Sequence, residues 1–334
     1  MDRKAIALLS GGLDSTLAVR VMLEQDIDVI ALNFTSVFCN CTSRKGACRS
    51  EAVRVAEEFG IPIKVLHKGL DYIEIVKKPR FGYGKGINPC VDCRIYMYSL
   101  AKRYMEEIGA SFIFTGEVLG QRPMSQRRDV FRVVEKESGL EGLILRPLCA
   151  KHLKPTIPEE SGIIDRERLL DFVGRSRRAQ MDLAESFDIN NYPCPSGGCL
   201  LTDKIFSRKV RDLLEHEDTI ATKDLQMLKS GRHFRTADGV KIVVGRDESD
   251  NIRLRNLCQE GDALVEPVDF GGPVAVACGG VKNGTKALIG RMILWYAGKK
   301  SEGKGTLRLI TDDGETTFTV DSPMDGNIME EMRV

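Results

Sequence analysis

The chain has 334 residues, which favours two domains over one, and 42% of its residues are hydrophobic, so it can bury a sizeable core. Its formal net charge of +1 excludes a broadly basic nucleic-acid binder, so any RNA contact has to use local patches of charge. No apolar run reaches the length of a membrane span and no signal peptide opens the chain, so we expect a cytoplasmic protein without a membrane partner.

The chain contains ten cysteines. Because the cytosol keeps thiols reduced, we do not expect a disulfide framework, and metal binding or sulfur chemistry is the better interpretation. Cys39, Cys41 and Cys48 match no standard zinc spacing, and we interpret them as structural or incidental.

The first predicted strand and helix are joined by a turn that is typical of a phosphate site. An apolar run over 5–9 is followed by two glycines and then by residues at helical spacing over 17–23. Glycines let backbone amides approach phosphate oxygens, and a helix N-terminus adds positive potential. The candidate contacts for a nucleotide are Ser10, Gly11, Gly12, Asp14, Ser15 and Thr16. The Walker pattern is not met because no lysine follows the second glycine, and a helix-capping turn is the alternative.

Strands and helices then alternate through the first 150 residues. Strands are predicted over 28–34, 63–66, 111–115 and 143–148, with helices over 50–59 and 91–108. Right-handed crossovers between such strands predict an α/β fold with a doubly wound parallel sheet and a site at the carboxyl ends of its strands. Further candidate ATP contacts at that edge are Asn33, Thr115 and Gly116.

Two later segments place cysteines where chemistry is expected. Cys90 and Cys93 begin the predicted helix over 91–108, where the helix dipole is expected to lower thiol pKa values. Two thiols at this spacing can also share one metal. The segment over 192–203, which contains Cys199, is rich in proline and glycine and is typical of a rigid loop over a site.

Basic residues gather in two segments of the first part. The polar segment over 121–128 can bind phosphate or an RNA backbone, although a solvated loop explains it equally well. Its arginines are Arg122, Arg127 and Arg128. The cluster over 174–178 lies in a predicted helix over 165–187, and we interpret it as a solvated helix face.

The part from 204 to 334 is predicted to be a smaller α+β domain. Helices are expected over 204–215, 223–229 and 286–296, a strand near 240–244, a strand ending at 278, a hairpin over 306–320, and a loose tail after 321. Arg232 and Arg246 flank an Asp-Gly turn and are candidate RNA contacts, with an ordinary α+β hairpin unit as the alternative.

Four motifs in this order resemble the tRNA thiouridylase branch of the PP-loop ATP pyrophosphatases, over residues 1–203: Ser10–Ser15, Asn88–Cys93, Thr115–Glu117 and Ser196–Asp203. The resemblance implies that Cys93 and Cys199 are catalytic. Redox-type members commonly have an aspartate at the position of Cys90. The three thiols instead resemble iron–sulfur-dependent tRNA thiolation enzymes, which implies a [4Fe-4S] cluster on Cys90, Cys93 and Cys199. A persulfide–disulfide cycle of Cys93 and Cys199 is the alternative, and Cys194 is an alternative ligand.

The resemblance implies tRNA uridine thiolation: ATP with Mg²⁺ near Asp14, adenylation of a uracil carbonyl oxygen, and sulfur from sulfide or a persulfide-carrying protein. The part after residue 204 resembles NFACT-type RNA-binding domains. A PP-loop enzyme that thiolates or amidates a small molecule, or a non-enzymatic iron–sulfur RNA-binding protein, are the alternatives. The sequence decides neither the ring position, the tRNA, nor the oligomeric state, for which a homodimer is one option.

Overall fold

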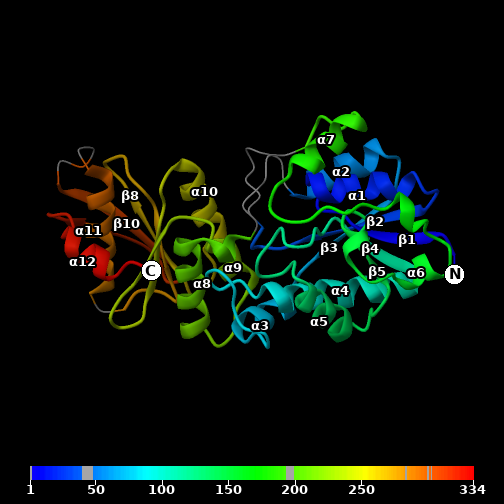
Figure 1. Ribbon diagram of the computed structural model, residues 1–334. Coiled ribbons are helices and arrows are strands. Elements are labelled where there is room, and N and C mark those ends of the chain that lie inside the picture. Colours follow the sequence, from blue (N-terminus) through cyan, green and yellow to red (C-terminus); the bar gives the residue numbers. More distant parts are fainter. Residues whose placement is uncertain (1, 40–47, 193–198, 283, 299–300, 302) are drawn as a thin grey trace. The chain divides into compact units, whose positions relative to one another are not determined.

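The computed structural model describes residues 2–39, 48–192, 199–282, 284–298, 301 and 303–334. The chain forms two compact units, Met1–Thr202 and Asp203–Val334, each of which is described by itself (Figure 1). Among the helices within the described ranges, none combines the length and apolarity that crossing a bilayer requires.

The first unit is built on a five-stranded sheet in the order β3-β2-β1-β4-β5, in which every pair is parallel. Its strands are β1 (Lys4–Leu8), β2 (Asp28–Thr35), β3 (Ile63–His67), β4 (Phe112–Thr115) and β5 (Ile144–Leu145). The predicted doubly wound parallel sheet is confirmed. The strand order reverses between β1 and β4, and in such sheets ligands bind at the carboxyl ends of the strands beside that point.

Helices cover both faces of this sheet (Figure 1). One face carries α1 (Leu13–Leu23), α2 (Cys48–Glu58) and α7 (Arg178–Ser186), and the other carries α4 (Cys90–Glu107) and α5 (Arg128–Ser138). Strand alternation divides the core, because Ala5 and Ala7 of β1 pack on the first face and Ile6 on the second. The short helices α3 (Asp71–Lys77) and α6 (Ile157–Glu160) complete the unit.

The helix predicted over 165–187 is wrong for most of its length. Only a 3₁₀ turn over Arg166–Arg168 and α7 form, and the chain between them is not helical. The backbone N–H groups of Leu170 and Phe172 donate to the carbonyl oxygens of Pro147 and Leu148, at 2.9 and 2.8 Å. These long-range hydrogen bonds outweigh the local helical pattern.

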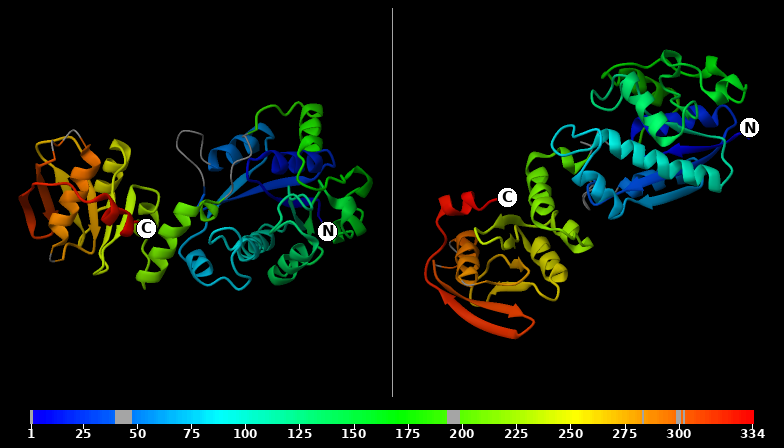
Figure 2. Two further views of the ribbon diagram at one scale, coloured as in Figure 1. Left: turned by 60° about the vertical axis from the view of Figure 1, so that its left-hand side comes forward. Right: turned by 90° about the horizontal axis from the view of Figure 1, so that it is seen from below.

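The second unit contains a six-stranded antiparallel sheet in the order β11-β10-β8-β9-β7-β6 (Figure 2). Its strands are β6 (Arg232–Arg235), β7 (Lys241–Val244), β8 (Ala263–Pro267), β9 (Ala275–Cys278), β10 (Gly305–Thr311) and β11 (Gly314–Val320). Its helices are α8 (Lys204–His216), α9 (Thr222–Met227), α10 (Glu248–Leu257), α11 (Thr285–Ala297) and α12 (Gly326–Glu331). The predicted smaller α+β domain is confirmed.

The tail after residue 321 is not loose, as the sequence predicted, but ends in α12. Asp325 caps this helix by accepting hydrogen bonds from the N–H groups of Asn327 and Ile328. Met324 and Met329 are buried in the core of the second unit. The prediction was based on the acidic composition of the tail and did not take into account that these two methionines pack into the core.

Candidate active site

The turn between β1 and α1 holds its shape through hydrogen bonds among its own residues. The Ser10 and Ser15 hydroxyls lie 3.0 Å apart, and the hydroxyls of Ser15 and Thr16 donate to the Gly12 carbonyl at 2.9 and 3.1 Å. The N-cap of α1 is Gly12, and no side chain caps the helix. The capping interpretation is therefore not what the structure has, and the first N–H groups of α1 are left for an anion.

Two close approaches require glycine around this turn. A Cβ at Gly11, whose φ is +76°, would lie 2.6 Å from the backbone nitrogen of Ala52. A Cβ at Gly116 would lie 2.4 Å from the backbone of Asp14. The turn that follows β4 thus packs directly on the backbone that follows β1, and both glycines fix the shape of the phosphate-type turn.

Replacement of Gly11 by alanine is expected to lower the free energy of unfolding well beyond the cost of its backbone angle. The matched control is Gly60→Ala, because Gly60 has a similar φ of +65° and nothing within 4 Å of an added Cβ. We expect about 1–2 kcal/mol for the control and at least ~2 kcal/mol more at Gly11, measured by urea unfolding. Equal losses in the two variants would contradict the close packing against α2.

Asp14 is the charged centre of the turn. Its Oδ2 atom accepts from the Arg177 guanidinium at 2.9 Å and from the Gln121 amide at 3.0 Å. Its Oδ1 atom is buried and has no hydrogen-bond partner among the described residues, and the same holds for the Gln121 Oε1 and Arg177 Nε atoms. Unpartnered buried oxygens beside a phosphate-type turn are the donor set that a hard cation such as Mg²⁺ prefers.

Three other predicted ATP or phosphate contacts lie around this turn. Asn33 is buried, donates its amide to the Leu9 carbonyl at 2.8 Å, and has no hydrogen-bond partner for its own oxygen among the described residues. Thr115 accepts from the N–H of Glu117 at 3.2 Å. Desolvation and then Arg94 lower the pKa of Arg122, although part of its side chain stays exposed. Arg122 therefore lies near other cations, Arg94 and Arg177, and an anion bound there would be stabilised by their combined positive charge.

The three predicted thiols come together in the first unit. Cys90 and Cys93 lie in the first turn of α4. Cys199 forms an antiparallel bridge with Cys39, just beyond β2, and the N–H of Ile87 donates to the Leu201 carbonyl at 3.0 Å. The loop that carries Cys199 is thereby tied both to the end of β2 and to the segment before α4.

Lys68 and Tyr72 lie among these thiols. The Lys68 ammonium is 3.3 Å from the Cys93 sulfur and 4.4 Å from the centre of the Tyr72 ring. Burial, and then the neighbouring Cys93, Cys199 and Cys90, raise the pKa of Tyr72. One buried phenol therefore interacts with all three sulfurs.

The thiols do not form a closed site for a single ion. Among the described residues, no three His, Cys, Asp or Glu side chains are grouped as a single metal ion requires. A cubane cluster asks for a wider set, because each thiolate binds a different iron. Cys93 interacts electrostatically with both Cys90 and Cys199, and three soft thiols arranged around it fit that chemistry, whereas a mononuclear zinc site does not fit the described residues. Cys194, the alternative ligand, lies outside the described residues.

The expected lowering of thiol pKa values at the start of α4 is wrong for Cys90. Burial raises the pKa of the Cys90 thiol, and Arg94 only partly offsets it. Burial and the neighbouring Cys93 raise the pKa of Cys199 to about 12. At Cys90, desolvation therefore outweighs the helix dipole.

Glu117, the residue after the Thr115-Gly116 turn, joins β4 to α4 and β5. Its carboxylate accepts from Arg94 at 2.5 Å, from Arg146 at 3.1 Å and from the Tyr98 hydroxyl at 3.0 Å. Burial acts to raise the pKa of Glu117, but Arg94 and Arg146 outweigh it and hold the pKa below its usual range. This buried network of ion pairs holds α4, the helix that begins with Cys90 and Cys93, against the carboxyl end of β4.

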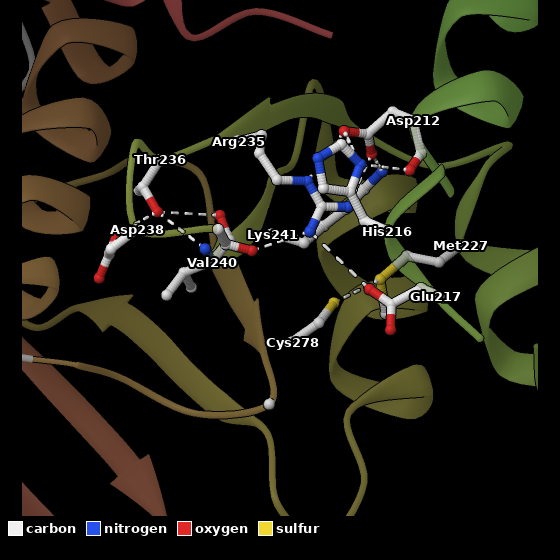
Figure 3. Close-up of polar contacts among 12 residues, drawn as sticks. Asp212, His216, Glu217, Met227, Arg235, Thr236, Asp238, Val240, Lys241 and Cys278 are labelled. Atoms are coloured by element: carbon white, nitrogen blue, oxygen red, sulfur yellow. Dashed lines mark hydrogen bonds and ion pairs between the residues drawn. The ribbon is translucent and has the colours of Figure 1, made fainter. Parts of the chain in front are cut away.

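The predicted RNA contacts of the second unit already have partners. Arg232 donates to the Gly245 carbonyl at 2.8 Å and lies over the Tyr296 ring, and Arg246 pairs with Asp250 at 2.5 Å. Figure 3 shows the neighbouring cluster, in which Asp212 of α8 binds Arg235 and Lys241 of the sheet. Burial acts to raise the pKa of Asp212, but these two cations outweigh the effect of burial, and the pKa lies below its usual range. This cluster joins α8 to β6 and β7.

The segment over 121–128 has two different environments. Arg127 pairs with Asp129 at 2.5 Å, and both side chains are exposed. Arg128 lines a cavity beside α5 instead. The arginines of this segment therefore do not act as one patch.

Sequence reasoning missed several site residues. Arg177 was assigned to a solvated helix face, yet it lies before α7 and contacts Asp14. Lys68 and Tyr72 stand in no motif, and only the folded chain brings them to the thiols. Gln121 belongs to the polar segment over 121–128, but its contact with Asp14 was not foreseen. For Arg177, the sequence did offer one indication, the arginine cluster over 174–178, because several arginines close together are typical of an anion-binding site.

The Cys39–Cys199 bridge makes the position of the Cys199 loop testable. The Leu200 N–H donates to the Phe38 carbonyl at 2.9 Å, which makes Cys39 and Cys199 a non-hydrogen-bonded pair. Such pairs have Cα atoms about 4.5 Å apart, within the range of disulfides. Oxidised glutathione added to the metal-free chain is expected to link these two cysteines, as read by peptide mass spectrometry. A chain in which Cys199 forms no link to Cys39 would contradict this placement.

The first unit thus combines a parallel sheet, a phosphate-type turn at the switch point of that sheet, and three cysteines around one buried phenol. Residues 1–157 match the family model described as thiamine biosynthesis protein (ThiI), and residues 231–331 match the NFACT protein RNA binding domain. The first unit is thus similar to the ThiI family over residues 1–157, and the second unit is similar to the NFACT RNA-binding domain over residues 231–331.

Individual relatives are similar to this chain over different shares of its length. The tRNA-specific 2-thiouridylase MnmA of Clostridium acetobutylicum is 26% identical over 80% of this chain and 84% of that protein. A probable tRNA sulfurtransferase of Methanothermobacter thermautotrophicus is 31% identical over 35% of this chain and 30% of that protein. Several others are matched over only about a third of their own length, such as 36% and 37%. The solved U34-tRNA thiolase NcsA from Methanococcus maripaludis with its [4Fe-4S] cluster is 18% identical, covers 66% of this chain and 76% of that one, and has a TM-score of 0.33.

Proposed function

We propose that this protein replaces a carbonyl oxygen of a tRNA uridine by sulfur, with conversion of ATP to AMP and pyrophosphate. The observation that carries the proposal is the convergence of an anion-binding turn and three thiols, from two remote parts of the chain, within the first unit. The tRNA-modifying relatives and the RNA-binding family match support tRNA as the substrate class.

In the first half-reaction, the turn holds ATP. The N–H groups at the start of α1 bind the pyrophosphate part, together with the Ser10 hydroxyl. The hydroxyls of Ser15 and Thr16, which donate to the Gly12 carbonyl in the structure, would turn to donate to phosphate oxygens. Asp14 would hold Mg²⁺ through its unpartnered Oδ1 atom, and the ion would neutralise phosphate charge. The uracil oxygen attacks the α-phosphorus, and pyrophosphate leaves with the electrons of the broken P–O bond. The target base has to leave its stack to reach this point.

In the second half-reaction, the adenylated oxygen is replaced. A cluster on Cys90, Cys93 and Cys199, when bound, would leave one iron open to hold sulfide. Sulfide attacks the ring carbon, the carbon–oxygen bond breaks, and AMP leaves with the former uracil oxygen. The Lys68 ammonium lies 3.3 Å from the Cys93 sulfur and would donate to that sulfur when Cys93 serves as a ligand.

A persulfide on Cys199 is the rival route, and the electrostatics of the site disfavour it. With its pKa raised to about 12, the Cys199 thiol is a weak nucleophile at neutral pH. Metal binding removes that limit, since the ligand loses its proton to the metal. We therefore favour Cys199 as a thiolate ligand of the cluster over Cys199 as a free thiol that carries a persulfide.

The test uses the full chain, reconstituted without oxygen with iron and sulfide, and incubated with ATP and unmodified tRNA. We expect one thiouridine per pyrophosphate released, and none with free uridine or UMP, as measured by nucleoside mass spectrometry. Equal pyrophosphate release with a small molecule would replace tRNA thiolation by small-molecule chemistry. No ATP binding at millimolar nucleotide would favour a non-enzymatic iron–sulfur or RNA-binding protein.

A further inference from the structure

A separate cavity of about 490 Å³ lies in the first unit, at the end of β5. Its walls come from α5, from the residues of and just after β5, and from the segment that leads into α6. This volume falls in the range of pockets that bind small ligands or parts of larger ones. The candidate ATP contacts and the three thiols are not among its lining residues.

The lining of this cavity is strongly basic. Its charged side chains are Arg128, Arg132, Arg146, Lys151 and Lys154, against Glu135 and Glu159. Both carboxylates are already neutralised, because Glu135 pairs with Arg146 at 2.5 Å and Glu159 pairs with Arg166. The cavity therefore offers net positive charge to a ligand.

Three of these cations have no carboxylate partner within the described part of the chain: Arg128, Arg132 and Lys154. The Arg146 side chain is only 2% exposed, yet its Nη2 atom has no hydrogen-bond partner among the described residues. A buried guanidinium N–H without an acceptor costs free energy. Since the Nη2 atom of Arg146 is buried, the unpaired cations Arg128, Arg132 and Lys154 are the groups of the cavity wall that an anion can contact directly.

The position of the cavity relates it to the candidate active site. Arg146 directly follows β5, so the cavity lies at the same carboxyl edge of the sheet as the phosphate-type turn, two strands away from β1. Arg146 and Arg94 share the carboxylate of Glu117, at 3.1 and 2.5 Å. The cavity wall is thus joined by one buried ion-pair network to the helix that begins with the thiols.

We propose that this cavity binds backbone phosphate groups of the tRNA on one side of the target base. The inference rests on the proposed function, because it assumes that the base enters at the β1–β4 switch point. When the target base of the tRNA occupies that point, the phosphate groups of the neighbouring nucleotides are expected to lie along the same edge of the sheet. Unpaired arginine and lysine side chains are the usual partners of such phosphates. A free phosphate or mononucleotide has the same chemistry and is the alternative source.

The test compares two triple variants of the full chain. Arg128→Ala/Arg132→Ala/Lys154→Ala removes the unpaired cations of the cavity. Lys78→Ala/Arg103→Ala/Lys136→Ala is the matched control, because these cations are exposed on the same unit and do not line the cavity. Binding of unmodified tRNA is measured at several salt concentrations, beside separate titrations with inorganic phosphate and AMP. The Kd for ATP checks that the fold of both variants is intact.

We expect the cavity variant to bind tRNA at least ~10-fold more weakly than wild type, with a salt slope reduced by about 2. The control is expected to lose less than about threefold, and the Kd for ATP should stay unchanged in both. Equal tRNA affinity in the two variants overturns the inference, as does tight binding of phosphate or AMP that the cavity variant loses while tRNA binding is unaffected. A wild-type chain that binds tRNA through the cavity but thiolates nothing would contradict the proposed function and leave this inference standing.

Discussion

Replacement of Cys199 by alanine is expected to remove most of the iron from the reconstituted protein and to lower thiouridine formation at least ~100-fold. The residue supplies one of three thiols, and its antiparallel bridge to Cys39 ties its loop to the chain just beyond β2. The same loss is expected for Cys90→Ala and Cys93→Ala. Iron is measured by atomic emission, with about four irons per chain for an intact cubane.

The matched control for these variants is Cys258→Ala. Cys258 follows α10 in the second unit and packs beside its core rather than among the three thiols. The control should keep its iron and its activity. Full iron occupancy in all three site variants would discard the cluster, and loss of activity in Cys93→Ala and Cys199→Ala but not in Cys90→Ala would favour the persulfide route.

Asp14→Asn is expected to slow pyrophosphate release about 100-fold while the chain stays folded. The substitution keeps the size of the side chain but removes the charge that pairs with Arg177 at 2.9 Å, and it replaces one of the two carboxylate oxygens by an NH₂ group, which cannot bind a cation. Because both changes act on the bound nucleotide, we expect a higher Mg²⁺ requirement together with the lower rate. Steady-state assays across a Mg²⁺ series measure both quantities.

Asp182→Asn is the control for this charge change, because Asp182 is exposed on α7 in the same unit. Its rate should equal that of the wild type. An Asp14→Asn variant with normal pyrophosphate release at every Mg²⁺ concentration would remove Asp14 from the candidate site. The iron content of this variant should stay normal, which separates the nucleotide half of the site from the thiol half.

The sequence was most informative where one short segment determines one local structure. The apolar run before Ser10 and the two glycines after it predicted a strand, a tight turn and a helix, and β1 and α1 form there. The alternating pattern also predicted the parallel sheet, since buried strands separated by helices leave few other topologies. The positions of Cys90 and Cys93 at the start of α4 follow from the same local reasoning.

The sequence failed where long-range contacts decide the outcome. The non-helical chain before α7 is set by hydrogen bonds of Leu170 and Phe172 to residues more than twenty positions away, which no local pattern reveals. The raised pKa of Cys90 depends on burial, and the sequence offered only the helix dipole, which has the opposite sign. The basic cavity beside α5 joins separate segments, so its charge is hidden in a chain with a net charge of only +1.

The central claim is that a uracil oxygen is adenylated before sulfur replaces it, and an oxygen label tests it most directly. A tRNA whose target uridine carries ¹⁸O at the reacting carbonyl is incubated with the reconstituted protein, ATP and sulfide, and the AMP is analysed by mass spectrometry. The account predicts that each thiouridine formed yields one AMP that carries the ¹⁸O. Thiouridine formed alongside unlabelled AMP would contradict it, because the oxygen on phosphorus would then have come from water.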